Sequence, residues 1–154
     1  MGFGLPAAIG AAIAYPQKLT ILITGDGSFQ LKIQKLVTLR RNNLNIKIVL
    51  FNNYCHGMVR QFQESYFPVN LQSTMIGYTA PDFISVVEAY AIPGKRLMPN
   101  FSIIDTIKEF LFSEGPAMLE VPLSQTSKVY PKLAFGRPFS EMEPDSDPIS
   151  MEST

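Results

Sequence analysis

Two short polar segments come directly after apolar segments, and their residue types suit metal and phosphate binding. The first is Gly25-Asp26-Gly27-Ser28 and the second is Asn52-Asn53. Ligands of open α/β sheets bind at the carboxyl ends of the strands, so residues at these two places are candidates for a site. A carboxylate and an amide oxygen are hard ligands that suit Mg2+, which takes its remaining ligands from water and from a phosphate-bearing ligand.

Asp26 on its own has a plain structural interpretation, because an acidic residue between two glycines is typical of a tight turn. However, Asp26 and Asn53 end two segments that a right-handed crossover places as strands of one sheet, so their oxygens can face one small volume. The flanking glycines, Gly25 and Gly27, let the backbone approach a ligand, and free N–H groups at the start of the following helix favour negative charge. We therefore predict that Asp26 and Asn53 bind Mg2+ together with a phosphate-bearing ligand.

The first residues of the chain offer a second interpretation. Gly2, Gly4 and Ala7 fit the pattern G-x-G-x-x-A, and Asp26 follows at the end of an apolar segment, as in the fingerprint of dinucleotide-binding domains. That fingerprint requires a strand immediately before the first glycine, and only Met1 precedes Gly2 in this sequence. It also leaves the Asn52-Asn53 segment without a role.

The elements that must position these residues follow from the apolar pattern. From Gly2 to Phe112 the pattern alternates between helical and strand periods, which is typical of a doubly wound α/β fold with a mainly parallel sheet. We predict helices over 6–14, 31–41, 81–90 and 103–112, and strands over 19–24, 46–51 and 117–121. The stretch 61–80 has no clean period and is interpreted as a long connection that serves a site. From Glu141 onward the acidic residues have no basic neighbours, so we expect a mobile tail.

Composition narrows the class of protein. The 154 residues are 46% hydrophobic and 17% charged, as in an ordinary globular domain. The 13 basic residues balance the 13 acidic ones, which argues against nucleic acid as a partner. The longest apolar segment, residues 2–15, is too short and too interrupted to cross a membrane, and no basic residue precedes it as in a signal peptide. The single cysteine, Cys55, fits a reducing compartment, so we expect a cytoplasmic protein.

Three longer segments carry a resemblance to a known family. MGFGLPAAIGAAIAYP, GDGSFQLKIQKLVTLRRNNLNIKIVLFNN and HGMVRQFQ resemble the diphosphate-binding domain of thiamine diphosphate enzymes, most closely the acetolactate synthase group. The resemblance implies that Asp26 and Asn53 ligate Mg2+ and that the backbone carbonyl of Cys55 completes the protein ligands. It further implies that six residues contact thiamine diphosphate: Met1, Gly25, Gly27, Ser28, Gly57 and Met58.

The resemblance also implies a division of the chain and an activity. Residues 1–124 would form the cofactor-binding domain, and residues 125–154 a C-terminal extension with an acidic tail. Enzymes of this group decarboxylate a 2-oxo acid such as pyruvate and transfer the two-carbon unit to another carbonyl, the carbon chemistry being that of the cofactor.

The family also implies that this chain depends on sequences outside it. In the family, a pyrimidine-binding domain with the activating glutamate, a middle domain and the opening strand of the present domain precede this segment. We therefore expect a fold that is truncated at its N-terminal end and a chain that is inactive by itself. It would act as a homo-oligomer or with a separate chain that bears the pyrimidine-binding domain. The alternative is a non-catalytic module that holds the Mg2+-diphosphate group without turnover.

Overall fold

The computed structural model describes residues 1–67, 70–100 and 102–149. Its internal contacts divide the chain into two compact units. The first unit contains residues 1–54 and 79–123, apart from residue 101, and the second contains residues 55–78 and 124–149, apart from residues 68 and 69.

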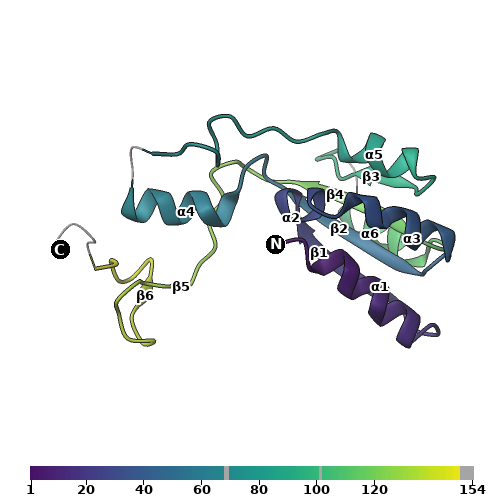
Figure 1. Ribbon diagram of the computed structural model, residues 1–154, viewed down its shortest axis with the longest axis horizontal. Helices are drawn as coiled ribbons and strands as arrows, with labels where there is room; N and C mark the ends of the chain where they lie inside the picture. Colours follow the sequence, from purple (N-terminus) through teal and green to yellow (C-terminus); the bar gives the residue numbers. More distant parts are fainter. Residues whose placement is uncertain (68–69, 101, 150–154) are drawn as a thin grey trace. The chain divides into compact units, whose positions relative to one another are not determined.

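The first unit is built on a four-stranded sheet in the order β1-β2-β4-β3, and all its strand pairs are parallel (Figure 1). The strands are β1 (Thr20–Gly25), β2 (Ile46–Asn52), β3 (Gly94–Arg96) and β4 (Ala117–Pro122). Three of them were predicted: β1 and β2 from apolar runs rich in β-branched residues, which suit strands covered on both faces, and β4 from the segment 117–121. The prediction omitted β3, because its three residues, a glycine and two basic residues, carry no apolar pattern.

The helices of this unit connect the strands. They are α1 (Gly4–Ala14), α2 (Asp26–Gln30), α3 (Leu36–Arg41), α5 (Phe83–Ala89) and α6 (Ile103–Phe112), with a 3-10 turn η1 (Ile33–Lys35) before α3. The alanine-rich prediction over 6–14 is confirmed by α1, in which Pro6 lies in the first turn, where its missing N–H removes no intrahelical bond. The helix predicted over 31–41 is shorter in the structure, because the chain turns at residues 31 and 32 before η1.

Helices cover the sheet on both faces. The larger core packs residues of α1, α3 and α5 against Leu22, Ile48 and Met118 of the sheet. The smaller core joins Phe110 of α6 to Leu119 of β4. Since consecutive side chains of a strand point to opposite faces, Met118 and Leu119 place the two cores on opposite sides of the sheet. The predicted doubly wound α/β fold is thereby confirmed.

The second unit consists of α4 (Gly57–Tyr66) and a two-stranded antiparallel sheet of β5 (Lys132–Leu133) and β6 (Met142–Glu143). The Gln61 side chain forms two hydrogen bonds with the backbone of Val129: Nε2 donates to the carbonyl at 3.1 Å and Oε1 accepts from the amide at 3.0 Å. The buried Arg60 donates to the carbonyl of Ser127 at 2.6 Å. The helix α4 therefore continues through residues 61–66, where the sequence predicted irregular chain. The prediction missed it because α4 buries polar side chains, which bond to distant backbone groups, at positions where a helical pattern is expected to be apolar.

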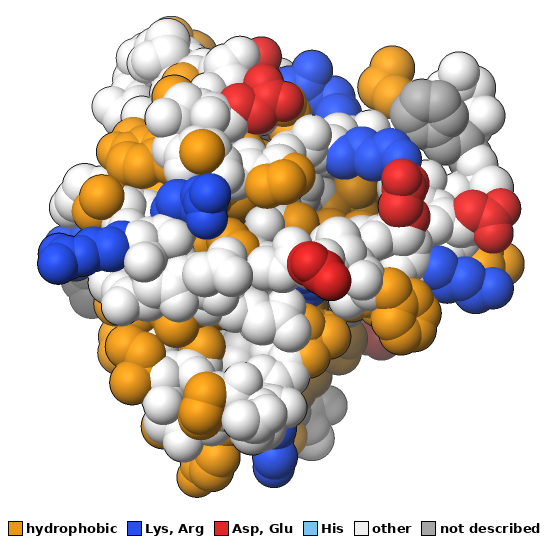
Figure 2. Space-filling model, turned by 90° about the vertical axis from the view of Figure 1, so that its right-hand side faces the viewer, with side chains coloured by type: hydrophobic (Ala, Val, Ile, Leu, Met, Phe, Trp, Pro, Cys, Tyr) orange, Lys and Arg blue, Asp and Glu red, His pale blue; other side chains and the backbone are white. Residues whose placement is uncertain are grey.

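Several large apolar side chains of the first unit are exposed. They include Ile21 and Ile23 on β1, and Ile104 and Phe112 on α6. On the face of the molecule seen in Figure 2, hydrophobic side chains are exposed among basic and acidic side chains. None of the helices in the described ranges is long and apolar enough to cross a membrane.

Candidate functional site

Asp26 lies at the junction of a strand and a helix. The strand β1 ends at Gly25, and α2 begins with Asp26, whose side chain is only 3% exposed. The backbone of Gly25 is extended, with φ −94° and ψ 162°. A Cβ atom on Gly25 would meet only the carbonyl oxygen of Phe51, at an ordinary 3.8 Å, so packing in this unit does not require a glycine there. Close approach by a ligand is a separate reason for a residue without a side chain.

Asn53 follows the neighbouring strand at the same edge of the sheet. The register of the parallel pair β1 and β2 sets Gly25 opposite Phe51, so Asp26 and the pair Asn52-Asn53 continue from paired positions. Asn53 is half-buried, and Tyr54 after it has a positive φ of 53°. The structure thus brings the two predicted side-chain ligands to the carboxyl ends of adjacent strands.

The side chain of Asn52 is engaged with residues that the sequence analysis did not single out. Its Nδ2 donates to Oε1 of Glu120 at 2.7 Å, and its Oδ1 accepts from the backbone N–H of Tyr54 at 3.1 Å. The second oxygen of Glu120, Oε2, accepts from Nε of Arg96 at 2.9 Å. This hydrogen bond raises the pKa of Arg96 above its ordinary value. The only sequence signal for this arrangement is an acidic residue inside the apolar strand β4.

The first residues of the chain lie beside the start of α2. The N–H of Gly2 donates to the hydroxyl of Ser28 at 2.9 Å. Gly2 has a positive φ of 77°, and a Cβ there would meet Leu31 and Lys32 at 3.3 Å, so glycine is required at this close approach. Gly27 is buried and Ser28 half-buried, whereas Met1 is exposed. The structure therefore brings Met1 and Ser28, which were predicted to contact the cofactor, into one neighbourhood.

The other predicted residues, Cys55, Gly57 and Met58, belong to the second unit. The buried Cys55 donates from Sγ to the carbonyl of Gln125 at 3.5 Å, so the thiol is engaged within its own unit. The Cys55 carbonyl accepts the N–H of Gly57 at 2.9 Å, which uses one of its two lone pairs.

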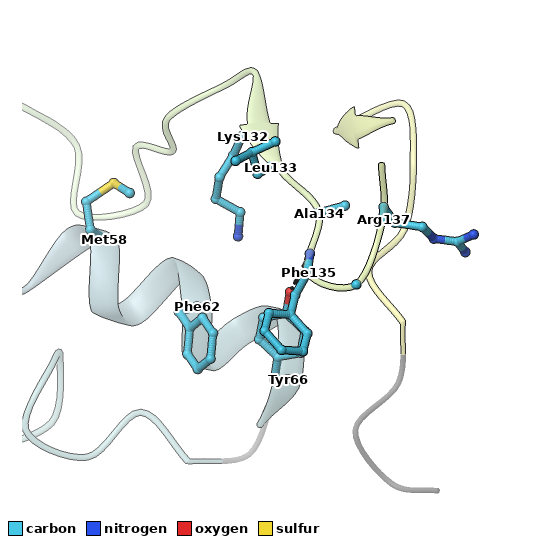
Figure 3. A pocket seen from close by; sticks show the side chains of 9 residues that line it. Met58, Phe62, Tyr66, Lys132, Leu133, Ala134, Phe135 and Arg137 are labelled. Carbon is cyan, nitrogen blue, oxygen red and sulfur yellow. Dashed lines mark hydrogen bonds between the residues drawn. The ribbon is translucent and has the colours of Figure 1, made fainter. Parts of the chain in front are cut away.

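Met58 lines a pocket within the second unit. Side chains of α4 form one side of this pocket, and residues 132–137 form the other, as Figure 3 shows. Its volume is about 420 Å³. The hydroxyl of Tyr66 accepts a hydrogen bond from the N–H of Phe135 at 3.1 Å, and the two rings meet edge to face with centroids 5.9 Å apart. The pocket is mainly apolar, with Lys132 and Arg137 at its lining.

The donor set suits Mg2+ better than a transition metal. No group of three or more His, Cys, Asp or Glu side chains that could hold a metal occurs among the described residues. The predicted side-chain ligands are instead a carboxylate and an amide, which are hard oxygens that suit Mg2+, whereas zinc sites are built mainly from Cys and His. The residues present therefore fit a magnesium ion that is shared with a phosphate-bearing ligand.

Comparison with known proteins defines the class to which this fold and site belong. The family described as "Thiamine pyrophosphate enzyme, C-terminal TPP binding domain" matches residues 1–121. The chain belongs to this family, and the resemblance stated from its sequence motifs is confirmed. Membership implies thiamine diphosphate with Mg2+ as the usual cofactors. The dinucleotide interpretation gains no support, because the matching family is one of thiamine pyrophosphate enzymes.

Acetolactate synthases are among the curated proteins that are similar to this chain. The acetolactate synthase large subunit of Cyanidium caldarium is 37% identical over 92% of this chain and 24% of its own length. The isozyme 2 large subunit of Escherichia coli (strain K12) is 38% identical over 92% of this chain and 26% of its own length. Acetolactate synthase 2, chloroplastic, of Zea mays is 35% identical over 96% of this chain and 24% of its own length. The chain thus spans about a quarter of the length of these relatives.

Proposed function

We propose that this chain binds the diphosphate end of thiamine diphosphate through Mg2+, with Asp26 and Asn53 as the side-chain ligands. The observation that carries the proposal is the placement of these residues after the paired ends of β1 and β2 in a chain of the thiamine pyrophosphate family. The carbonyl of Cys55 is proposed as the third protein ligand on the resemblance and on its place two residues after Asn53. Gly25, Gly27 and Ser28, together with Met1, Gly57 and Met58, are proposed to contact the cofactor.

The residues of this chain hold and orient the cofactor in this proposal, and none of them acts as an acid or base. When bound, thiamine diphosphate supplies the chemistry that stabilises negative charge on the substrate carbon. Asp26 and Asn53 fix the metal, and the metal offsets the charge of the diphosphate. The exposed, apolar Met58 would lie along the organic part of the cofactor rather than against its diphosphate.

The reaction that we propose is that of the acetolactate synthases to which the chain is similar: decarboxylation of a 2-oxo acid such as pyruvate and carboligation of the two-carbon unit. The relatives are about four times as long as this chain. We therefore propose that residues 1–124 supply the cofactor-diphosphate part and residues 125–154 an extension. The pyrimidine part would come from sequence outside this chain or from a partner chain. A cytoplasmic location is proposed from the single cysteine.

Titration calorimetry of the 154-residue chain with thiamine diphosphate, with and without Mg2+, tests the proposed site. Binding should require Mg2+ and should weaken at least tenfold, about 1.4 kcal/mol, in Asp26→Ala and in Asn53→Ala. Asn45→Ala is a matched control, because the exposed Asn45 precedes β2 at the opposite end of the same strand. Equal binding by all four proteins, or no binding at any concentration, would count against the assignment. Binding of NAD without Mg2+ would favour the dinucleotide interpretation.

A further inference from the structure

Glu120 is a buried carboxylate in a strand that is otherwise apolar, and it is 0% exposed. A buried charge is costly unless it is paired and hydrogen-bonded, so a carboxylate at this position needs partners on both oxygens. The sheet supplies both partners. In the strand register Glu120 lies opposite Leu50 of β2 and Arg96 of β3, and Asn52 lies two residues after Leu50 on the same face.

Glu120 determines the orientation of the side-chain amide of its first partner, Asn52. A carboxylate oxygen only accepts hydrogen bonds, so the Nδ2 of Asn52 must face Glu120, at 2.7 Å. The remaining oxygen, Oδ1, then faces the backbone N–H of Tyr54 and accepts it at 3.1 Å. Asn52 is 1% exposed, so neither end of its amide can exchange these partners for bulk water.

The bond from Tyr54 to Asn52 closes the turn that carries Asn53. Tyr54 has a φ of 53°, in the left-handed region that residues with side chains seldom adopt, so this conformation needs support. An asparagine side chain that accepts the N–H two residues later is a common device for such a turn. Asn53 is the residue between the two bonded positions, and the bond therefore fixes the direction in which its backbone leaves β2.

The second partner, Arg96, anchors the other side of Glu120. Its Nε donates to Oε2 of Glu120 at 2.9 Å, and its Nη2 donates to Oδ1 of Asp82 at 2.8 Å. The Asp82 carboxylate also caps α5, because it accepts the N–H of Ile84 at 3.2 Å. Arg96 thus supplies the counter-charge to Glu120 and links it to a helix on one face of the sheet.

We propose that Glu120 is a positioning residue for the metal site: by orienting the amide of Asn52, it holds the Asn52–Tyr54 turn in the conformation that presents Asn53 to Mg2+. The inference rests on the proposed function of Asn53. Both oxygens of Glu120 are occupied by Asn52 and Arg96, so Glu120 acts through the turn and is not itself a ligand.

The test exchanges donors and acceptors with little change of shape, and its double variant also keeps the net charge of the pair. In Glu120→Gln, the new amide can accept from Arg96 only by turning its NH2 group toward Asn52. The Asn52 amide must then flip, and its own NH2 group meets the N–H of Tyr54. In the double variant Glu120→Gln with Asn52→Asp, a carboxylate at position 52 accepts from both the glutamine and Tyr54. A structural role that depended only on the buried Glu120 charge would not be rescued in this way.

Two measurements on the 154-residue chain report the effect. The first needs no ligand: amide hydrogen exchange of Tyr54 by NMR should be roughly tenfold faster in Glu120→Gln than in the unmodified chain. The second is Mg2+-dependent affinity for thiamine diphosphate, which should fall roughly tenfold, as is common when a partner of a metal ligand is lost. The double variant should restore both. Glu109→Gln, the same change at an exposed glutamate in the same unit, should alter neither.

The outcomes separate this inference from the proposed function. Unchanged Tyr54 exchange in a folded Glu120→Gln variant, or a double variant that restores neither quantity, would overturn the positioning role. Faster exchange with unchanged affinity would overturn its link to the metal. If Asp26→Ala also leaves the affinity unchanged, the proposed function has failed. The rate of Tyr54 amide exchange still shows in that case whether Glu120 holds the Asn52–Tyr54 turn. If Glu120→Gln does not fold, Asn52→Ala removes the same acceptor and should show the same two losses.

Discussion

Lys47 tests how the first unit is held together, because this charged residue is fully buried and its ammonium reaches the end of α6. It lies on β2, is 0% exposed, and donates from Nζ to the carbonyl of Ser113 at 2.8 Å and to the carbonyl of Gly115. Ser113 is the C-cap of α6, so the ammonium satisfies carbonyl groups that follow the last turn of that helix. Burial lowers the pKa of Lys47 below its ordinary value. Replacement with methionine, Lys47→Met, keeps the apolar stem and removes the donor.

The size of the expected loss follows from the contacts. Each hydrogen bond from a charged group contributes about 1.5–3 kcal/mol. Ser113 is exposed and Gly115 is half-buried, so water can replace part of what their carbonyls lose. Removal of the lysine also removes the free-energy cost of burying its charge, which offsets part of this sum. We therefore expect Lys47→Met to lower the free energy of unfolding by about 2–3 kcal/mol, a roughly 30- to 150-fold change in the unfolding equilibrium.

Urea unfolding followed by circular dichroism measures this change. Lys95→Met is the matched control, because Lys95 also forms an ion pair, with Glu109 at 2.6 Å, but both side chains are largely exposed. Exposed pairs contribute about 0.2–1 kcal/mol, so the control should change stability little. A Lys47→Met variant as stable as the control would refute the reasoning, and would mean that water or neighbouring groups replace the ammonium at the end of α6.

Three further predictions concern the cap of α5, activity and association. Asp82→Ala should lower the free energy of unfolding by about 1 kcal/mol at pH 7 through loss of the α5 cap. The hydrogen bond from Ser85, the N–H of Ile84 and the charge of Arg96 lower the pKa of Asp82, so its contribution to stability is present above about pH 4 and falls away at lower pH. The stability difference between variant and parent in urea titrations should therefore shrink at pH 3. The 154-residue chain alone should release no carbon dioxide and form no acetolactate from pyruvate, so turnover by the purified chain would contradict its proposed dependence on other sequence. The chain should associate at higher concentration through exposed apolar residues, and Ile23→Lys should reduce its mass in light scattering, whereas a concentration-independent monomer mass would contradict this.

The sequence by itself determined the class of fold and the candidate ligands. Apolar runs rich in β-branched residues predicted β1 and β2, since a buried parallel strand is apolar on both faces, and the mainly apolar segment 117–121 predicted β4. The alanine-rich run predicted α1. Asp26 and Asn53 could be named in advance because each directly follows such a run, and the right-handed crossover rule places the two strands in one sheet. The local pattern is sufficient for these predictions, because the hydrophobicity and β-branching of neighbouring residues depend on whether the segment is a buried strand, a helix or a turn.

Only the tertiary structure decided which polar side chains meet. The sequence could show that Glu120 is an acidic residue in an apolar strand, but its partners come from β2 and β3, far apart along the chain. The same holds for Lys47, whose acceptors follow α6, and for Gln61, which pairs with the backbone of Val129. A buried polar group is stable only when a partner satisfies it, and that partner is chosen by strand register and helix packing. Neither of these is encoded in a local period, so the residues that support Asn53 emerged only from the folded chain.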